Sequence, residues 1–92
     1  MPYFAHVIEG VVQKVERIEH EPMQDEKGVE KESIGQEFLA SLYPGTNPAD
    51  YILTFYPLGQ PDPYPRGKYA GNGDLWDGSK FTSPLVNDGA AK

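Results

Sequence analysis

The chain has 92 residues, and its 8 Lys and Arg against 14 Asp and Glu give a formal net charge of −6. This acidic balance disfavours nucleic acids and anionic membrane surfaces as partners, because binding to both relies on clustered basic residues. There is no cysteine, which excludes a disulfide framework and a cysteine-based zinc site.

The length fits one domain, which we expect to cover residues 1–84, followed by a polar tail over residues 85–92. No apolar run approaches the ~18 residues that a membrane-spanning helix needs. The first residues lack the basic and apolar regions of a signal peptide, so we expect synthesis in a cytosol. The high content of proline and glycine, 9 and 10 residues, is typical of a loop-rich β protein.

The first predicted element is a β-hairpin. Residues 3–8 and 11–18 are rich in β-formers, and Glu9-Gly10 between them is a two-residue turn signal. The apolar residues of the return strand do not share one strict face, which indicates a bulge or an edge position. Residues 19–31 are highly charged and are interrupted by Pro22 and Gly28, so we interpret them as a solvated loop.

A short helix is predicted next. Ser33 and Gln36 fit a capping box, in which each side chain bonds the backbone amide of the other residue. Pro44-Gly45 ends the helix. Its apolar stripe, which must pack on a sheet, is Ile34, Phe38 and Leu42, broadened by Leu39.

The remaining chain predicts three strands and a proline-rich arm. Residues 51–56 read as a central strand, and residues 57–66 as an extended, polyproline-like arm. Residues 69–76 and 80–82 form the last hairpin around Asp77-Gly78. The fold class is therefore α+β, a small antiparallel β-meander in the order β-β-α-β-β-β with one short helix packed on the sheet.

Several of these segments together resemble a family of small tailed-bacteriophage proteins. The resemblance covers the opening Phe4-Ala5-His6-Val7-Ile8 with its Val-rich return strand, Gly28-Val29-Glu30, the helix Gly35-Gln36-Glu37-Phe38-Leu39-Ala40-Ser41-Leu42, and Tyr69-Ala70-Gly71-Asn72-Gly73 with Trp76-Asp77, Phe81 and Pro84. Asn72 and Asp74 stand where the family pattern has an apolar and an aromatic residue, the turn is shorter, and residues 45–66 match little.

The resemblance implies a virion or virion-associated protein. We expect a non-enzymatic structural or accessory protein, either of the tail or baseplate or as a capsid decoration protein. It would be located in the virion and would bind other phage virion proteins through protein–protein contacts. It could also form a homo-oligomer. The alternative from another class is a small carbohydrate-binding module for host-surface glycan, with Trp76 and Tyr69 as stacking platforms.

No cofactor, metal or catalytic site is predicted. Asn72, Asp74 and Asp77 have oxygen ligands at short spacing but lack the other ligands of a calcium loop, so we assign them to turns. His6 and His20 have no ligand spacing between them. The acidic side chains between positions 16 and 32 are mixed with Lys and Arg, which is typical of a solvated loop rather than a catalytic carboxylate pair.

Aromatic residues are the best candidates for a binding surface. Five of them could form either the core of a small sheet or a face that binds a partner. They are Tyr51, Tyr56, Tyr64, Tyr69 and Trp76. Tyr64 is favoured as an interface residue because it lies in the proline arm. The partner-binding residues that we predict are Tyr64, Pro61, Pro63, Pro65, Tyr69 and Trp76.

Overall fold

The computed structural model describes residues 1–59 and 61–83, so the expected C-terminal tail lies outside the described residues. The described chain contains five strands, one α-helix and two short 3₁₀ helices. In chain order they are β1 (Tyr3–Ile8), β2 (Val11–Arg17), η1 (Glu21–Met23), α1 (Glu32–Leu42), η2 (Pro48–Asp50), β3 (Tyr51–Phe55), β4 (Leu75–Trp76) and β5 (Phe81–Thr82). This content confirms the α+β class.

The β1–β2 hairpin forms as predicted. Glu9 and Gly10 both have positive φ, 50° and 78°, which is the backbone of a primed two-residue turn. The register shifts between His6 and Val7, where β2 contains Gln13 as an extra residue. The irregular face pattern of β2 therefore comes from a bulge, one of the two reasons that the sequence suggested.

All strand pairs are antiparallel, and the sheet order is β3-β1-β2-β4-β5. The prediction that residues 51–56 form a central strand was wrong, because β3 adds to the outer side of β1 and lies at an edge. The strands consequently do not follow chain order across the sheet, as they would in a simple meander. Helix α1 forms the connection that brings β3 back beside β1.

Most charged side chains of residues 19–31 are exposed, as expected of the predicted solvated loop, but the segment also contains regular structure. It contains η1 and an antiparallel bridge between Gln24 and Glu30. Met23 is only 1% exposed and packs in the core beside Ile18. Met23 anchors to the core a segment whose other residues are mostly charged or polar.

Helix α1 begins one residue before the predicted cap. Lys31 is the N-cap and has no side-chain cap hydrogen bond, so the predicted capping box is absent. Gln36 instead donates from Nε2 to the carbonyl of Tyr51, at 2.6 Å, across to the edge strand β3. Tertiary contact therefore outcompetes the local cap for this side chain.

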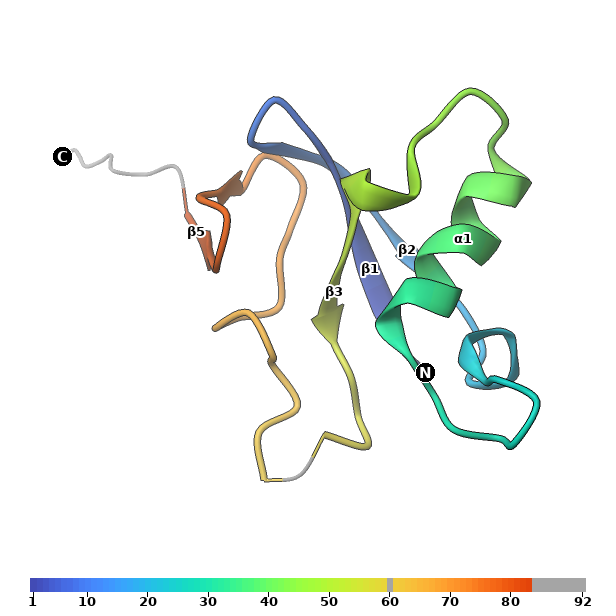
Figure 1. Cartoon of the computed structure of the whole chain (residues 1–92). Coiled ribbons are helices and arrows are strands. Elements are labelled where there is room, and N and C mark those ends of the chain that lie inside the picture. Colours follow the sequence, from blue (N-terminus) through green and yellow to red (C-terminus); the bar gives the residue numbers. More distant parts are fainter. Residues whose placement is uncertain (60, 84–92) are drawn as a thin grey trace, which may run out of the picture.

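Two apolar clusters lie on opposite faces of the sheet. Figure 1 shows strands β1, β2 and β3 between α1 on one side and the β4–β5 hairpin on the other. The cluster under α1 is made of Phe4, Ile18, Met23, Leu39, Tyr51 and Leu53. The cluster under the hairpin is made of Ala5, Val7, Val12, Ala70 and Phe81. Alternation along β1 sends Phe4 to the first cluster and its neighbour Ala5 to the second.

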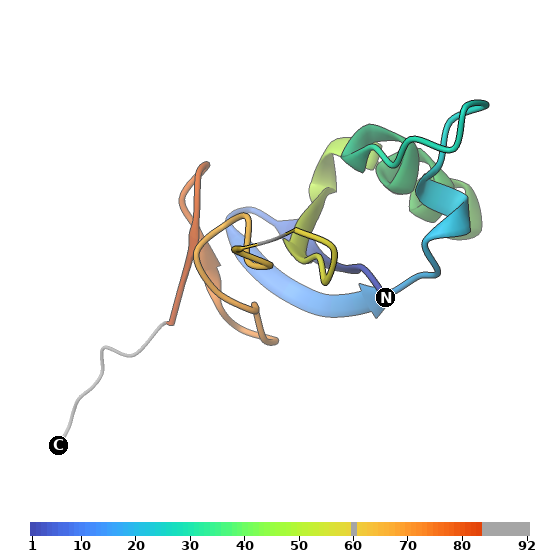
Figure 2. The same cartoon turned by 90° about the horizontal axis from the view of Figure 1, so that it is seen from below.

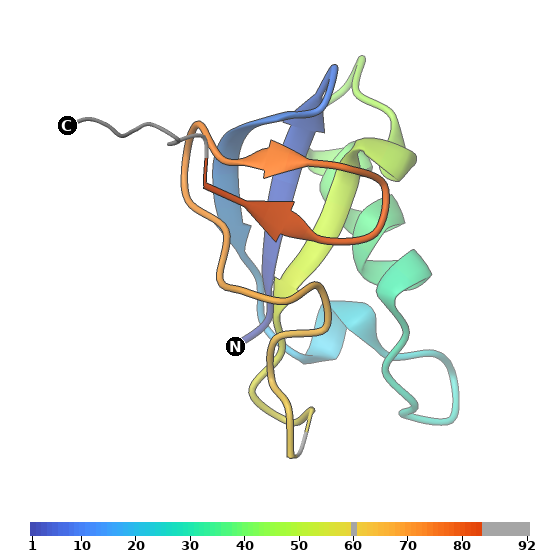
Figure 3. The same cartoon turned by 90° about the vertical axis from the view of Figure 1, so that its left-hand side faces the viewer.

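The last hairpin is shorter than predicted, because residues 69–74 form a loop and not a strand. Asp74 is 7% exposed, and its carboxylate accepts from the backbone N–H of Gly71 at 2.8 Å and pairs with Lys68 at 2.8 Å. Gly73 has a φ of 89°, which a strand residue cannot adopt. The loop crosses the face of the sheet in front of β1 and β2 (Figure 3).

We predict that Gly35→Ala destabilises the protein although alanine is the better helix former. A Cβ on Gly35 would lie 2.6 Å from Phe4 Cζ and 3.0 Å from Met23 Cγ, both buried. Overpacking costs about 1–3 kcal/mol, which exceeds the propensity gain of at most about 1 kcal/mol. The free energy of unfolding from urea titrations measures the difference.

Ser33→Ala is the matched control for this helix. Ser33 is exposed and makes no capping bond, so its loss should change stability by less than about 0.5 kcal/mol. A larger effect of Ser33→Ala than of Gly35→Ala would contradict both the missing cap and the close contact of Phe4 with the helix.

Candidate aromatic interface

A bulge in β3 creates the candidate site. Tyr3 pairs with Phe55 but Phe4 pairs with Leu53, so Thr54 is an extra residue on β3. An extra residue reverses the faces on either side of it. Phe55 therefore lies on the hairpin face of the sheet with Tyr3, and not on the helix face with Leu53.

Four rings meet on this face, and we call Tyr3, Phe55, Tyr64 and Tyr69 the aromatic patch. Phe55 is the centre, with ring centroids 5.7 Å from Tyr3, 5.4 Å from Tyr64 and 5.5 Å from Tyr69, and Tyr3 lies 5.2 Å from Tyr69. All four pairs are tilted, as aromatic rings prefer. Tyr64 and Tyr69 are 37% and 43% exposed, so the patch is open to solvent.

Thr54 holds Tyr69 in place from beneath. Its side chain is fully buried, and its hydroxyl donates to the carbonyl of Lys68 at 2.8 Å and accepts from the N–H of Ala70 at 2.7 Å. One hydroxyl thus binds the residues on both sides of Tyr69. This contact fixes the loop backbone while leaving the Tyr69 ring on the surface.

The proline-rich segment is a closed loop and not the extended arm that the sequence predicted. The N–H of Tyr56 donates to the carbonyl of Pro63 at 2.7 Å, and the N–H of Gly59 donates to the carbonyl of Tyr56 at 2.9 Å. Asp62 accepts from the N–H of Tyr64 at 2.9 Å. These bonds reverse the chain and bring Tyr64 onto Phe55; Figure 3 shows the loop beside the start of β1.

Carboxylates of the helix side anchor the two ends of this loop. Glu30 accepts from the Tyr56 hydroxyl at 2.8 Å and contacts His20 Nδ1 at 3.0 Å. Glu32 accepts from Arg66 at 2.6 Å and from the N–H of Leu53 at 2.9 Å. The loop is therefore positioned by charged hydrogen bonds from residues before and within α1.

Burial and hydrogen bonding shift the pKa values of these groups. Burial raises the pKa of Glu30, but hydrogen bonds from His20, Tyr56 and Gln24 outweigh it and hold that pKa below its usual value. Burial, and then the bond to the Glu30 carboxylate, raise the pKa of Tyr56. In the patch, burial and the neighbouring Tyr3 raise the pKa of the Tyr69 phenol, which therefore stays neutral and able to donate a hydrogen bond.

The structure brings some of the predicted partner-binding residues together and leaves others apart. Tyr64 and Tyr69 share the patch, while Pro61 and Pro65 are exposed in the loop and Pro63 is half-buried. Trp76 belongs to another group, since it is half-buried and its ring lies 4.7 Å from Phe81.

Two members of the aromatic patch were missed by the sequence prediction, namely Tyr3 and Phe55. Tyr51 is fully buried, and Tyr56 is half-buried and bonded to Glu30. The bulge at Thr54 determines which of these aromatic residues reach the patch. No pattern in the sequence indicated this bulge, so Tyr3 and Phe55 could not be assigned to the patch in advance.

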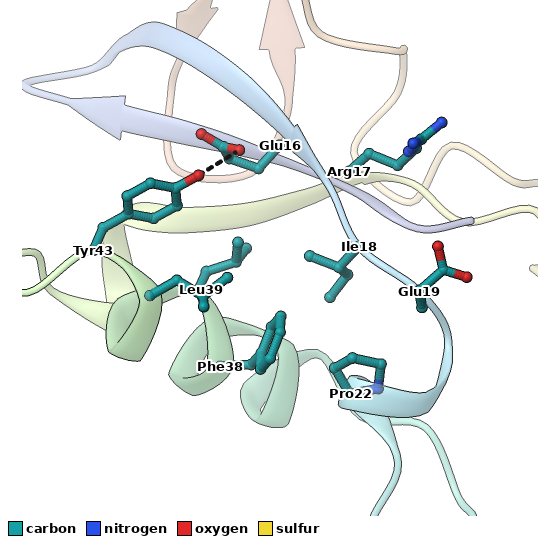
Figure 4. A pocket seen from close by; sticks show the side chains of 9 residues that line it. Glu16, Arg17, Ile18, Glu19, Pro22, Phe38, Leu39 and Tyr43 are labelled. Carbon is teal, nitrogen blue, oxygen red and sulfur yellow. Dashed lines mark hydrogen bonds between the residues drawn. The ribbon is translucent and has the colours of Figure 1, made fainter.

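A pocket separate from the aromatic patch lies between the end of β2 and α1. It is a pocket of about 260 Å³ with apolar walls that include Ile18, Phe38 and Leu39. Figure 4 shows the Glu16 carboxylate at its rim, where it accepts from the Tyr43 hydroxyl at 3.1 Å, and Glu19 at the opposite end. The carboxylate of Glu16 also pairs with Lys14 at 2.8 Å.

The residues weighed as metal ligands serve local structure. Asp77 accepts from the backbone N–H groups of Ser79 and Lys80, both at 2.8 Å, and these bonds hold its pKa below the usual value. His6 stacks on Tyr51 with centroids 4.6 Å apart. Within residues 1–59 and 61–83 there is no group of three or more His, Asp or Glu placed to hold a metal ion.

Over the same described residues, no helix combines the length and hydropathy that crossing a bilayer requires. Comparisons with protein-family models, with curated proteins and with solved structures find no match to this chain.

We predict that Thr54→Val lowers the stability of the fold and loosens the loop backbone that positions Tyr69. The change keeps the side-chain shape but leaves the buried N–H of Ala70 without its acceptor, which costs about 1–3 kcal/mol. Hydrogen exchange of the Ala70 amide should also accelerate. Thr82→Val, at an exposed position of β5, is the control, and equal effects of the two variants would contradict the role of Thr54.

We predict an acid-sensitive contribution from Glu30. Its folded pKa lies below the ordinary value of 4.5, so the unfolded chain takes up the proton first as the pH falls. The stabilisation is therefore complete above pH 4.5 and is lost as the pH falls through the folded pKa.

Glu30→Gln tests this contribution in urea titrations. It should lower the free energy of unfolding by about 1–3 kcal/mol near pH 7, and the difference from wild type should shrink as the pH is lowered below 4.5. Glu26→Gln, an exposed site in the same segment, is the control. A pH-independent loss in Glu30→Gln would show that the Glu30 charge contributes nothing.

Proposed function

We propose that the protein is a non-enzymatic structural or accessory component of a tailed-bacteriophage virion that binds other virion proteins through the aromatic patch. The observation that carries the binding surface is the cluster of four rings around Phe55, with Tyr64 and Tyr69 37% and 43% exposed. The virion assignment rests on the resemblance of the hairpins and the helix to small tailed-phage proteins. Within that assignment a tail or baseplate site is favoured slightly over the capsid surface.

The patch has the chemistry of an interface centre. Tyrosine combines a large apolar ring with a hydroxyl that can bond a partner, and it is enriched among residues that dominate binding energy. The patch residues come from β1, β3 and two loops that are fixed by buried or charged hydrogen bonds. A surface that is already ordered loses little conformational entropy when it binds.

A protein partner suits the surroundings of the patch. Leu58 of the proline loop is 59% exposed, and Pro61 and Pro65 of the same loop are exposed. These residues extend the apolar surface beyond the four rings. A partner with an apolar surface could cover the rings and the loop together, leaving polar residues at the rim.

The alternative, a glycan-binding module, is supported by the exposed ring of Tyr69. The second platform predicted for it, Trp76, packs on Phe81 instead of joining the patch. A sugar would therefore stack on Tyr69 with Tyr64 rather than with Trp76. Binding on a glycan array that is lost in Tyr69→Ala would favour this alternative over a protein partner.

We predict that Tyr64→Ala reduces incorporation of the protein into purified particles of its phage. Removing an interface tyrosine costs about 1–2 kcal/mol of binding, so occupancy should fall about 5- to 30-fold when sites are unsaturated. Quantitative mass spectrometry of the particles measures occupancy. The fold should persist, because Tyr64 contributes its loop bonds through the backbone.

Val29→Ala is the control for Tyr64→Ala. Val29 is also an exposed apolar residue, but it belongs to neither the proline loop nor the four-ring cluster. Normal occupancy of Tyr64→Ala particles would reject the patch as the contact surface. Absence of the wild-type protein from the particles would reject the virion assignment itself.

A further inference from the structure

Strands β3 and β2 lie on either side of β1, and their outer sides differ in how their backbone groups are bonded. The N–H of Leu53 donates to Glu32 Oε2 at 2.9 Å, and the carbonyl of Tyr51 accepts from Gln36 Nε2 at 2.6 Å. Glu32 and Gln36 are one helical turn apart on α1. Their side chains therefore bond the outward backbone groups of β3 in place of another strand, and this edge is closed.

The outer edge of β2 is covered only at its start. Val12 donates to the carbonyl of Asp74 and accepts from the N–H of Gly73, both at 2.8 Å. Beyond Val12, the described residues that pair with β2 all belong to β1. Figure 2 shows this second half of β2 at the rim of the molecule.

The alternation of backbone hydrogen bonds along β2 identifies which N–H and C=O groups point away from β1. Ile18 donates to the carbonyl of Pro2, at 3.0 Å, on the β1 side. Antiparallel strands alternate sides residue by residue, so Glu16 and Lys14 also bond β1, whereas Val15 directs its N–H and C=O away from it. Within residues 1–59 and 61–83, the Val15 backbone makes no hydrogen bond on that outer side.

The side chains along this open stretch are complementary to themselves. Two copies of β2 that pair antiparallel about Val15 place Lys14 of each copy opposite Glu16 of the other. Within one chain Lys14 and Glu16 already form an ion pair at 2.8 Å on the helix face. Pairing would therefore produce an alternating ring of four charges, with the two Val15 side chains adjacent on the opposite face.

We propose that the open edge of β2 is a self-association site, at which a second copy of the chain pairs antiparallel about Val15. The Val15 residues exchange two backbone hydrogen bonds across the two-fold axis, and the two sheets become one continuous sheet. This site is separate from the aromatic patch and does not depend on the proposed virion role.

Charge exchange tests the register of this pairing. In the full chain, Lys14→Glu puts two carboxylates along the edge and Glu16→Lys puts two ammonium groups there. Sedimentation velocity should show a dimer for the wild type and weakened self-association for each variant, because like charges then face each other. An equimolar mixture of the two variants should form a heterodimer.

The mixture isolates the contact between chains. Each single variant lacks the ion pair within its own chain, so mixing restores only the pairs between copies. Circular dichroism of each variant verifies that the fold is kept. Failure of the mixture to form a heterodimer would overturn the register, and a wild type that stays monomeric at its solubility limit would overturn the site.

A backbone substitution tests the hydrogen bonds directly. Val15→Pro removes the outward N–H and leaves the β1–β2 ladder intact, and proline is tolerated at such an edge position. The dimer should dissociate at least about 10-fold more readily, because two hydrogen bonds are lost. Val15→Thr keeps the N–H and should dimerise as the wild type does, whereas unchanged dimerisation of a folded Val15→Pro would overturn the proposal.

Discussion

The buried hydroxyl of Thr54 is the contact on which the arrangement of the second half of the chain depends. Thr54 is the extra residue that turns Phe55 onto the hairpin face, and its hydroxyl bonds the backbone of both Lys68 and Ala70. The loop that it holds places Ala70 in the second core and Tyr69 on the surface. One residue thus determines both how the sheet is covered and which rings remain exposed.

Side chains of helix α1 bond the outer backbone groups of the same edge strand, β3. Glu32 binds the N–H of Leu53 and the side chain of Arg66, so a single carboxylate joins the helix, β3 and the segment after the proline loop. A charged acceptor makes these hydrogen bonds stronger than neutral ones. The protein has no cysteine for a disulfide, and no metal site is found among the residues that the structure describes. Charged contacts such as these hold together segments that are distant in sequence.

The local elements were largely predictable from the sequence, and their long-range partners were not. Glu9-Gly10 specified the first hairpin because its turn chemistry is local. The position of β3 at the edge was missed, since a run of β-formers contains no information about its neighbours. Gln36 was predicted to cap its own helix but bonds Tyr51, because a partly buried tertiary contact was available.

The candidate site shows the same division. Tyr64 was predicted because it lies in the proline-rich segment, and Tyr69 because tyrosine is enriched at interfaces. Tyr3 and Phe55 were missed because their shared face depends on a one-residue bulge, which no pattern in residues 51–56 reveals. The proline segment was expected to extend, but Asp62 and Gly59 supply the bonds that close it.

The proposed contacts occupy different parts of the molecule, and this separation has a consequence for assembly. The aromatic patch draws on β1, β3 and two loops, while the open edge belongs to the far side of β2. One copy could therefore bind a partner through its rings and a second copy through β2 at the same time. When two copies are joined, binding of the second patch becomes intramolecular, which raises the overall affinity without any new contact at the patch. A small acidic domain with one modest apolar surface could in this way be held firmly on a repetitive assembly.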